Sequence, residues 1–219
     1  MIGQTLIKAG ILDHEKLIFG KPAALDPAAH PPYSPPPTPP IPSPPQRTNT
    51  MFYKIGEPHG LPHDPFKSCV LPRPIGWIST ISADGVVNLA PYSFFNALAS
   101  EPPMVMFSTN GKQPFGPKDS LTNAEATGEF VCSMATWDLR DSINLSSAPE
   151  APEVDEFELT GLETEPSELV KPPRVKAAPT HLECVYHTTV DLPCDIEGGR
   201  NAVCIGRVVG VHIGDEFLT

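Results

Sequence analysis

Hydrophobic and polar positions alternate with a period of two along much of the chain after residue 50, which is the pattern of half-buried β-strands. Many of these runs are rich in β-branched and aromatic residues, which favour strands. Between the first two runs, the turn Ala83-Asp84-Gly85 is typical of a β-hairpin. The pattern predicts strands over 75–82, 86–89, 104–108, 130–134, 182–192 and 202–213.

Helical signals are few. The segment DSLTNAEATG predicts a helix with Asp119 or Ser120 as its N-cap and Gly128 at the C′ position. A second short helix is predicted over 139–145. Residues 148–173 are acidic and rich in proline, so we expect them to run over the surface. Because strands and helices do not alternate regularly, the fold is predicted to be mainly β, an antiparallel barrel with a few peripheral short helices.

Proline is the most unusual feature of the composition. The chain has 29 prolines in 219 residues, and 12 of them lie in the first 50 residues. Ten of the fifteen residues from 31 to 45 are proline. Proline lacks an N–H group and clashes with the preceding helical turn, so the stretch 31–45 can form neither a helix nor a central strand. We expect residues 1–50 to be a disordered Pro-rich arm or an extension of the gene model ahead of Met51. Residues 51–219 are expected to form one folded domain.

Charge divides at the same place. The formal net charge is −11, and residues 51–219 alone carry −12. An acidic domain argues against binding to nucleic acid and to anionic membranes, and no run of 18 or more apolar residues predicts a membrane span. The five cysteines are widely spaced and odd in number, and the N-terminus is a poor signal peptide. We therefore expect reduced thiols and a cytoplasmic protein.

The segment NLAPYSFFNALASEPP interleaves polar and aromatic side chains after a strand that Pro91 is expected to break. Asn88, Ser93 and Asn96 offer hydrogen-bonding groups, while Tyr92 and the two phenylalanines after Ser93 offer flat apolar surface. A planar heteroaromatic ligand requires this combination. A strand that ends in an ordinary loop with core aromatics is the competing interpretation.

The segment 108–120 combines hydroxyl groups, glycines, Lys112 and Lys118 with the predicted helix start at Asp119-Ser120. Free N–H groups at a helix start beside a lysine form a phosphate site. In an acidic domain, a phosphate requires such a local positive pocket. A solvated loop with a plain N-cap is the alternative, although two such segments separated by one predicted strand favour a common ligand site.

Other chemistry has little support in the sequence. His181, Cys184 and His187 have a metal-like spacing, but on a strand His181 and His187 share a face while Cys184 points to the other. No metal site is therefore predicted. The chain has no G-x-S-x-G elbow, no P-loop and no dinucleotide fingerprint after a strand, which argues against a hydrolase, a P-loop ATPase and a Rossmann domain.

Over about residues 52–218 the chain resembles the flavin reductase-like family. The resemblance is carried by RPIGWIST at 73–80, DG at 84–85, NLAPYSFFN at 88–96, PP at 102–103, FS at 107–108, KDS at 118–120, Asn123, EATGEF at 125–130, DEF at 155–157 and KPPRV at 171–175. It implies the FMN-binding split β-barrel fold, an antiparallel and Greek-key-like barrel. It also implies a homodimer with FMN bound non-covalently near the subunit interface.

The same resemblance implies which residues contact FMN. The phosphate and ribityl chain are expected at Ser79, Thr80, Ser108, Lys118, Asp119 and Ser120. The isoalloxazine ring is expected against Ala90, Pro91, Tyr92, Ser93 and Asn96, and Asn88 is counted among the cofactor-binding residues. His212, near the end of the last strand, is the candidate catalytic residue for contacting a nicotinamide, with a plain half-exposed strand histidine as the alternative.

The resemblance implies an NAD(P)H:flavin oxidoreductase, in which hydride passes from a nicotinamide to the flavin and a monooxygenase can accept the reduced flavin. A non-catalytic FMN-binding or interaction protein and an oxidase of the pyridoxamine-phosphate type stay open as alternatives. The family usually continues past the strand that ends at Ile213 with a tail, so the domain is expected to be truncated at its C-terminus.

Overall fold

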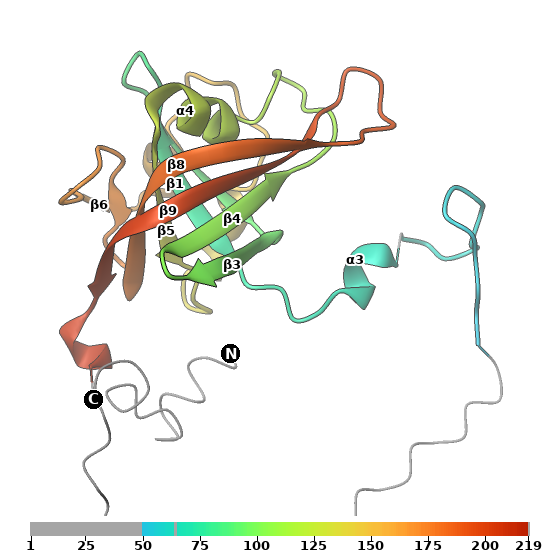
Figure 1. Cartoon of the computed structure of the whole chain (residues 1–219), viewed down its shortest axis with the longest axis horizontal. Coiled ribbons are helices and arrows are strands. Elements are labelled where there is room, and N and C mark those ends of the chain that lie inside the picture. Colours follow the sequence, from blue (N-terminus) through green and yellow to red (C-terminus); the bar gives the residue numbers. More distant parts are fainter. Residues whose placement is uncertain (1–49, 64, 219) are drawn as a thin grey trace, which may run out of the picture. The chain divides into compact units, whose positions relative to one another are not determined.

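The computed structural model describes residues 50–63 and 65–218 (Figure 1). The chain divides into two units, Met1–Gly60 and Leu61–Thr219. In the first unit the described residues are 50–60, where the N–H of Glu57 donates to the carbonyl oxygen of Lys54 at 3.0 Å and closes a turn. The expected Pro-rich arm, apart from Thr50, lies outside the described residues.

Seven strands of the second unit form one antiparallel sheet, in the order β2-β1-β5-β8-β9-β4-β3. The two longest strands, β8 and β9, have 13 residues each and pair along their length (Figure 1). Two register shifts in this pair bend the strands. The strands are β1 (Gly76–Ile81), β2 (Val87–Tyr92), β3 (Phe95–Ser100), β4 (Pro103–Thr109), β5 (Glu129–Met134), β8 (Thr180–Leu192) and β9 (Asn201–Ile213). The prediction of a mainly β, antiparallel fold is confirmed.

The remaining elements are short. They are α3 (Phe66–Cys69), α4 (Asp119–Thr127), α5 (Arg140–Leu145), α6 (Glu156–Thr160), the 3₁₀ helix η1 (Asp215–Phe217) and the two-stranded sheet of β6 (Thr164–Glu165) and β7 (Arg174–Val175). The helix α4, the longest among the described residues, packs against β1, β5 and β8 (Figure 1). Among the described residues, no helix has both the length and the apolar character to cross a membrane.

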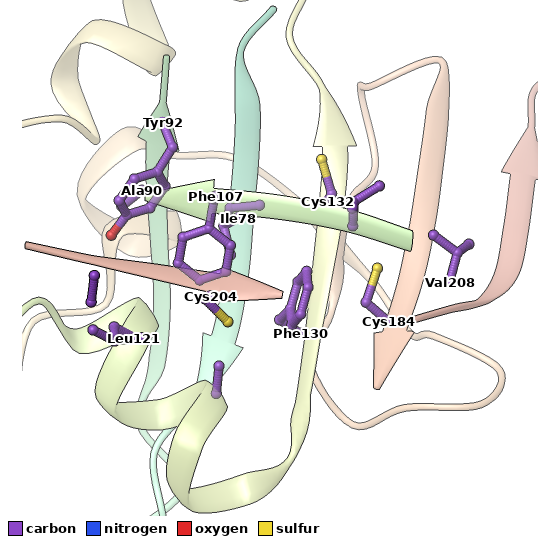
Figure 2. Packing of buried hydrophobic residues seen from close by; sticks show 13 residues of the cluster. Ile78, Ala90, Tyr92, Phe107, Leu121, Phe130, Cys132, Cys184, Cys204 and Val208 are labelled. Carbon is purple, nitrogen blue, oxygen red and sulfur yellow. The ribbon is translucent and has the colours of Figure 1, made fainter. Parts of the chain in front are cut away.

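The main core lies between the sheet and α4 (Figure 2). Phe130 and Phe107 are fully buried there and meet edge to face, with ring centroids 5.4 Å apart. Phe107 also contacts the ring of Tyr92, at 4.9 Å. Three of the five free thiols, those of Cys132, Cys184 and Cys204, are buried in this core, and burial raises the pKa of each.

Pro91 does not break its strand, contrary to the sequence-based expectation. It stays in β2, opposite Trp77 of β1. Because β2 is an edge strand, its open side pairs with no further strand. A proline there, which has no N–H group, therefore costs the sheet no hydrogen bond on that side. The strand β3, which forms the opposite edge of the sheet, was not predicted; five of its six residues are exposed, so it lacks the alternation that marks a half-buried strand.

The helix predicted over 119–128 exists, but its first turn differs from the prediction. Gly128 ends it in the left-handed conformation, with φ of 79°, as expected. The N-cap is Lys118, whose side chain caps no N–H group, so the assignment of Asp119 or Ser120 as N-cap was wrong. Ser120 instead turns its hydroxyl inward, where it donates to the Oδ1 atom of Asn88 at 2.7 Å.

The acidic stretch 148–173 is only partly the surface excursion that its composition predicted. Asp155 accepts a hydrogen bond from the N–H of Phe157 at 2.8 Å and caps α6. The helix then places Phe157 in a second core cluster around Trp77 and buries the carboxylate of Glu156 against β2. An acidic segment therefore supplies a buried charge to the interior.

Candidate functional site

Two pockets share the loop 113–118, which connects β4 to α4. We call the first the helix pocket. It is lined by Asn88, Ala90, the loop 113–118, Asp119, Ser120, Ser146, the stretch 148–150 and Glu156. We call the second the hairpin pocket, because the β8–β9 connection forms one wall. It has a volume of about 300 Å³ and is lined by the stretches 109–114 and 116–118, Leu121 and the stretch 198–200.

Asn88 is the centre of a buried hydrogen-bond network beside the helix pocket. Its Nδ2 atom donates to both carboxylate oxygens of Glu156, at 3.0 Å each. Its Oδ1 atom accepts from the hydroxyl of Ser120 at 2.7 Å and from that of Thr80 at 3.4 Å. Asn123 of α4 completes the network by donating to the hydroxyl of Thr80 at 3.1 Å. Side chains from β1, β2, α4 and α6 are thereby held in one arrangement.

The two pockets differ in charge. The helix pocket contains Lys118 but also three carboxylates, those of Asp119, Glu150 and Glu156. Burial raises the pKa of Asp119 and of Glu156 above the ordinary values for these acids, because desolvation disfavours the charged form.

The hairpin pocket is lined by three cationic side chains, those of Lys112, Lys118 and Arg200. The Arg200 guanidinium is held by Asp191 at 2.7 Å and by Glu125 at 3.0 Å, which fixes the end of the β8–β9 hairpin against α4. Because Arg200 is paired with two carboxylates, the positive charge that the hairpin pocket offers to an anion comes from Lys112 and Lys118.

The predicted ring-binding residues lie at the end of β2 and in the turn that follows. The hydroxyl of Tyr92 is buried and has no hydrogen-bond partner among the described residues, and burial raises its pKa well above the usual value. Ser93 accepts a hydrogen bond from Arg73 at 3.4 Å, and the same guanidinium lies over the ring of Phe94, 6.0 Å from its centroid. Asn96 is exposed on β3, where its side chain accepts from the N–H of Ala97.

The structure brings some of the predicted site residues together and leaves others apart. Asn88, Ala90, Lys118, Asp119 and Ser120 line one pocket, and Thr80 joins them through the Asn88 network. Ser79, Pro91, Tyr92, Ser93, Asn96 and Ser108 do not line either pocket.

Two of the predicted residues outside the pockets have partners of their own. The hydroxyl of Ser79 donates to the carbonyl oxygen of Pro173 at 2.5 Å. The N–H of Ser108 donates to the carbonyl oxygen of Phe94 at 2.9 Å, which ties β4 to the turn before β3.

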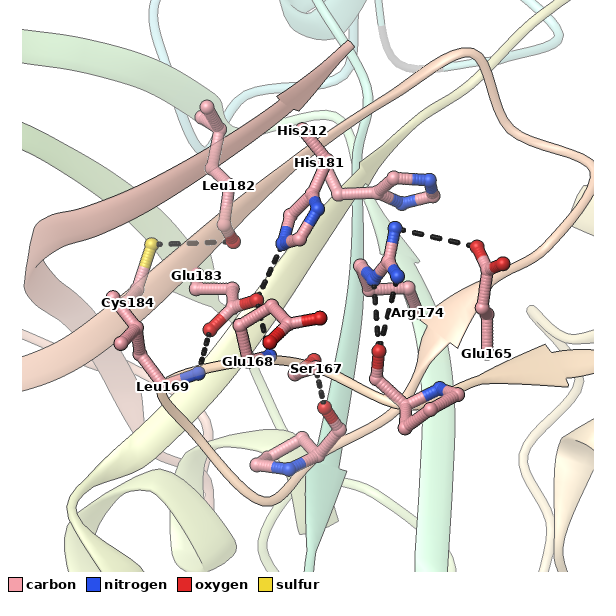
Figure 3. A network of polar contacts seen from close by, with 12 residues as sticks. Glu165, Ser167, Glu168, Leu169, Arg174, His181, Leu182, Glu183, Cys184 and His212 are labelled. Atoms are coloured by element: carbon pink, nitrogen blue, oxygen red, sulfur yellow. Dashed lines mark hydrogen bonds and ion pairs between the residues drawn. The ribbon is translucent and has the colours of Figure 1, made fainter. Parts of the chain in front are cut away.

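His212, the predicted catalytic residue, lies far along β9 from the hairpin pocket. With a rise of about 3.3 Å per residue, it is roughly 35 Å along the strand from Asn201, next to Arg200. Its Nε2 atom contacts Glu183 at 2.5 Å (Figure 3). The predicted catalytic role of His212 in contacting a nicotinamide stays a prediction.

Glu183 is the centre of the network that holds His212 (Figure 3). Its side chain is fully buried and accepts from the backbone N–H groups of Glu168 and Leu169, at 2.8 and 2.6 Å. Burial alone would raise the pKa of Glu183, but these donors together with His212 outweigh it and lower the pKa. The carboxylate thus fastens the stretch 168–169 to the sheet.

Sequence reasoning missed two contributors to the pockets. Glu156 lies in an acidic run between the exposed Glu153 and Glu158, and although the DEF motif at 155–157 marked it as part of the family pattern, no role in the site was predicted for it. The wall formed by Gly198, Gly199 and Arg200 comes from a hairpin connection about 80 residues away in sequence from Lys118. The adjacent glycines were the available signal, because Gly198 adopts a positive φ of 70°.

The chain belongs to the flavin reductase like domain family, whose sequence model matches residues 68–219. It is 44% identical over 121 residues to an uncharacterised protein of Aquifex aeolicus, a match that covers 55% of this chain and 62% of that protein. It is 40% identical over 151 residues to an uncharacterised protein of Halalkalibacterium halodurans, covering 68% of this chain and 71% of that protein. The chain therefore spans only about two thirds of the length of these relatives.

Solved structures with the same fold include nitrilotriacetate monooxygenase component B from Bacillus cereus. The two chains superpose with a TM-score of 0.62 at 33% sequence identity, and the match covers 68% of this chain and 74% of the component B chain. A protein of Shewanella frigidimarina assigned as a flavin reductase with a split barrel domain has a TM-score of 0.57 and 22% identity. That match covers 65% of this chain and 68% of the Shewanella chain. The FMN-binding protein of Thermus thermophilus has a TM-score of 0.60 and 17% identity, covering 78% and 85%. At these last two identities the likeness concerns the fold alone, and the fold is the split β-barrel that the motifs implied.

Proposed function

We propose that the chain binds FMN non-covalently and acts as an NAD(P)H:flavin oxidoreductase. The observation that carries the proposal is the convergence of Asn88, Ala90, Lys118, Asp119 and Ser120 on one pocket at the start of α4. These residues come from two segments that were expected, independently, to hold a ring and a phosphate. Family membership supports a flavin as the ligand.

The residues present fit a flavin mononucleotide. A phosphate would be held by Lys118, which lines both pockets, and by the N–H groups of Asp119 and Ser120 at the start of α4, while Lys112 adds positive charge from the hairpin pocket. Of the three carboxylates that line the helix pocket, that of Glu156 is already engaged by the side chain of Asn88 and by the N–H of Leu89. Small and aromatic residues from Ala90 to Tyr92 would contact the ring, and the unpartnered hydroxyl of Tyr92 is a buried donor on that side.

When bound, the flavin itself supplies the chemistry, because its ring accepts a hydride from a reduced nicotinamide. The chain's residues bind and orient it. Lys118 neutralises the phosphate, and the Asn88 network fixes the position of Ser120 at the helix start. Arg73, stacked over Phe94 and bonded to Ser93, places a positive charge beside the proposed ring position, where reduced flavin carries negative charge.

Two further parts of the proposal concern partners. Apolar side chains remain exposed on β3 and β9, among them Leu98 (51% exposed) and Val211 (60%). A second copy of the chain would cover such surface, in keeping with a homodimer that binds FMN near its interface. Similarity to a monooxygenase component B suggests a flavin-accepting monooxygenase as the consumer of reduced flavin.

The test uses the full chain under anaerobic conditions. FMN is added, its fluorescence and visible spectrum are recorded, and NADH or NADPH is then supplied in separate cuvettes. We expect saturable quenching of FMN fluorescence and enzyme-dependent bleaching of the flavin band, which returns when oxygen is admitted. Failure to bind FMN would refute the proposal as a whole, whereas binding without bleaching by either nucleotide would favour the non-catalytic FMN-binding alternative.

A further inference from the structure

The acidic segment 148–173 delivers one carboxylate to the proposed flavin site. Glu156, in the first turn of α6, is 6% exposed, lines the helix pocket and contacts two groups of β2. Its Oε2 atom accepts the backbone N–H of Leu89 at 2.8 Å, and both its oxygens accept from the side chain of Asn88 at 3.0 Å. Glu158, two residues further along the same helix, is exposed.

The contacts of Asn88 show how Glu156 acts on the pocket. A primary amide offers two N–H donors and an oxygen that accepts two hydrogen bonds. In Asn88 the donors face Glu156, and the oxygen faces the hydroxyls of Ser120 and Thr80. Asn88 therefore has no hydrogen-bonding capacity left for a ligand. Its role is to link the side chain of Glu156 to that of Ser120, so that the position of one depends on the position of the other.

The carboxylate also decides which way the amide points. A carboxylate accepts and cannot donate, so it selects the rotamer of Asn88 that turns the NH₂ group toward α6 and the carbonyl oxygen toward α4. In that rotamer the hydroxyl of Ser120 must donate to Asn88. This hydrogen bond fixes the orientation of the Ser120 hydroxyl, and with it the position of the first turn of α4 beside the pocket.

We propose that Glu156 is a positioning residue of the flavin site, which acts through Asn88 on Ser120 and on the first turn of α4. This inference rests on the proposed function, because it concerns how the phosphate end of FMN is held. Burial of Glu156 in a low-dielectric site raises the strength of its hydrogen bonds as well as the cost of leaving Asn88 unpaired. Glu156→Gln keeps the size of the side chain but replaces one of its two acceptor oxygens by an NH₂ group. That NH₂ group would face the NH₂ group of Asn88, so one hydrogen bond between the two side chains is lost.

The experiment compares FMN and riboflavin, which lacks the phosphate, in the full chain by fluorescence quenching. We expect Glu156→Gln to raise the dissociation constant of FMN about tenfold, the loss of one buried charge-assisted contact. The dissociation constant of riboflavin should change less than about threefold, because the ring contacts do not depend on α4. Glu158→Gln removes the same charge from the exposed side of the same helix, and it should leave both constants within about twofold.

A double-mutant cycle identifies the route of the effect. If Glu156 acts through Ser120, Glu156→Gln should weaken FMN binding less than about twofold in a Ser120→Ala background. Multiplicative effects of the two substitutions would overturn the proposed route. Equal weakening of FMN and riboflavin, or unchanged FMN binding in a folded variant, would overturn the positioning role itself.

Folding is checked by urea unfolding of each variant, and Glu156→Asp takes the place of Glu156→Gln if the latter does not fold. The shorter carboxylate keeps the charge but withdraws from Asn88, so the same selective loss of FMN affinity is expected, with the same contrary outcomes. If the unmodified chain binds neither flavin, the proposed function fails and the inference fails with it. Binding of FMN by the unmodified chain together with unaltered binding by the variants refutes the inference alone.

Discussion

Gly206 lies on β9 directly against the ring of Phe130, which belongs to the main core (Figure 2 shows this ring). A Cβ atom added at Gly206 would fall well inside van der Waals distance of two ring carbons of Phe130, and 3.2 Å from the carbonyl oxygen of Val185. Phe130 cannot withdraw freely, because it is fully buried and packs on Phe107. Gly206→Ala therefore forces the ring or the strand to move.

The size of the effect follows from the distances. Carbon atoms rest about 3.5–4.0 Å apart, so the ring must shift by more than about 1 Å. Overpacking costs about 1–3 kcal/mol, and a Cβ atom this close to a buried ring places Gly206→Ala in the upper half of that range, at about 2–3 kcal/mol. The loss of unfolded-state entropy on replacing glycine offsets about 0.4–1 kcal/mol. We expect a net loss of about 1–2.5 kcal/mol in the free energy of unfolding. At a urea m-value of about 2 kcal/mol/M, the midpoint should fall by about 1 M.

The same strand offers a matched control in Gly210. A Cβ there would meet Glu183 and Leu169 at 3.4 Å, which is ordinary contact, so Gly210→Ala should be neutral or stabilise by up to about 0.5 kcal/mol. Urea unfolding followed by far-UV circular dichroism measures both variants. Equal midpoints for the two variants would refute the packing argument. Because Phe107 also contacts Tyr92, Gly206→Ala should in addition weaken binding of the flavin ring.

Three further predictions test other parts of the structure. Lys118→Ala should raise the dissociation constant of FMN about tenfold or more, as expected for one charge-assisted contact to a phosphate, whereas Lys171→Ala should not change it; equal effects would refute the phosphate assignment. Burial and the nearby Arg174 lower the pKa of His181 to about 4. The unfolded chain binds that proton near pH 6.5, so stability should fall as pH falls from about 6.5 to about 4. Urea unfolding at pH 7 and at pH 5 measures the difference in the free energy of unfolding between the two pH values. His181→Gln should reduce this difference by up to about 2 kcal/mol, and the exposed His187→Gln should not. An unchanged difference in His181→Gln would contradict the lowered pKa of His181. A thiol reagent should label two cysteines rapidly in the native chain and the three buried ones only in denaturant, and rapid labelling of all five would contradict the core packing.

Much of the fold could be predicted from the sequence, because it follows from local periodicity. The alternation in 202–213 gave the strand β9 almost to the residue, and Gly128 ended α4 as its freedom at positive φ requires. The edge strand β3 could not be predicted, since an edge with exposed residues carries no burial pattern. Pro91 was misjudged because its effect depends on whether the strand lies at an edge, which is a property of the sheet order.

The candidate site shows the same division. The sequence by itself determined the family motifs, the existence of the helix α4 with its end at Gly128, and the excess of negative charge that makes Lys118 important. Only the tertiary structure decided that Asn88 is occupied by Glu156 and Ser120, and that Arg200 reaches the pocket from a distant hairpin. It also placed His212 on Glu183. The physical reason is that strand and helix signals come from residues a few positions apart, whereas burial and hydrogen-bond partners arise only where distant segments meet.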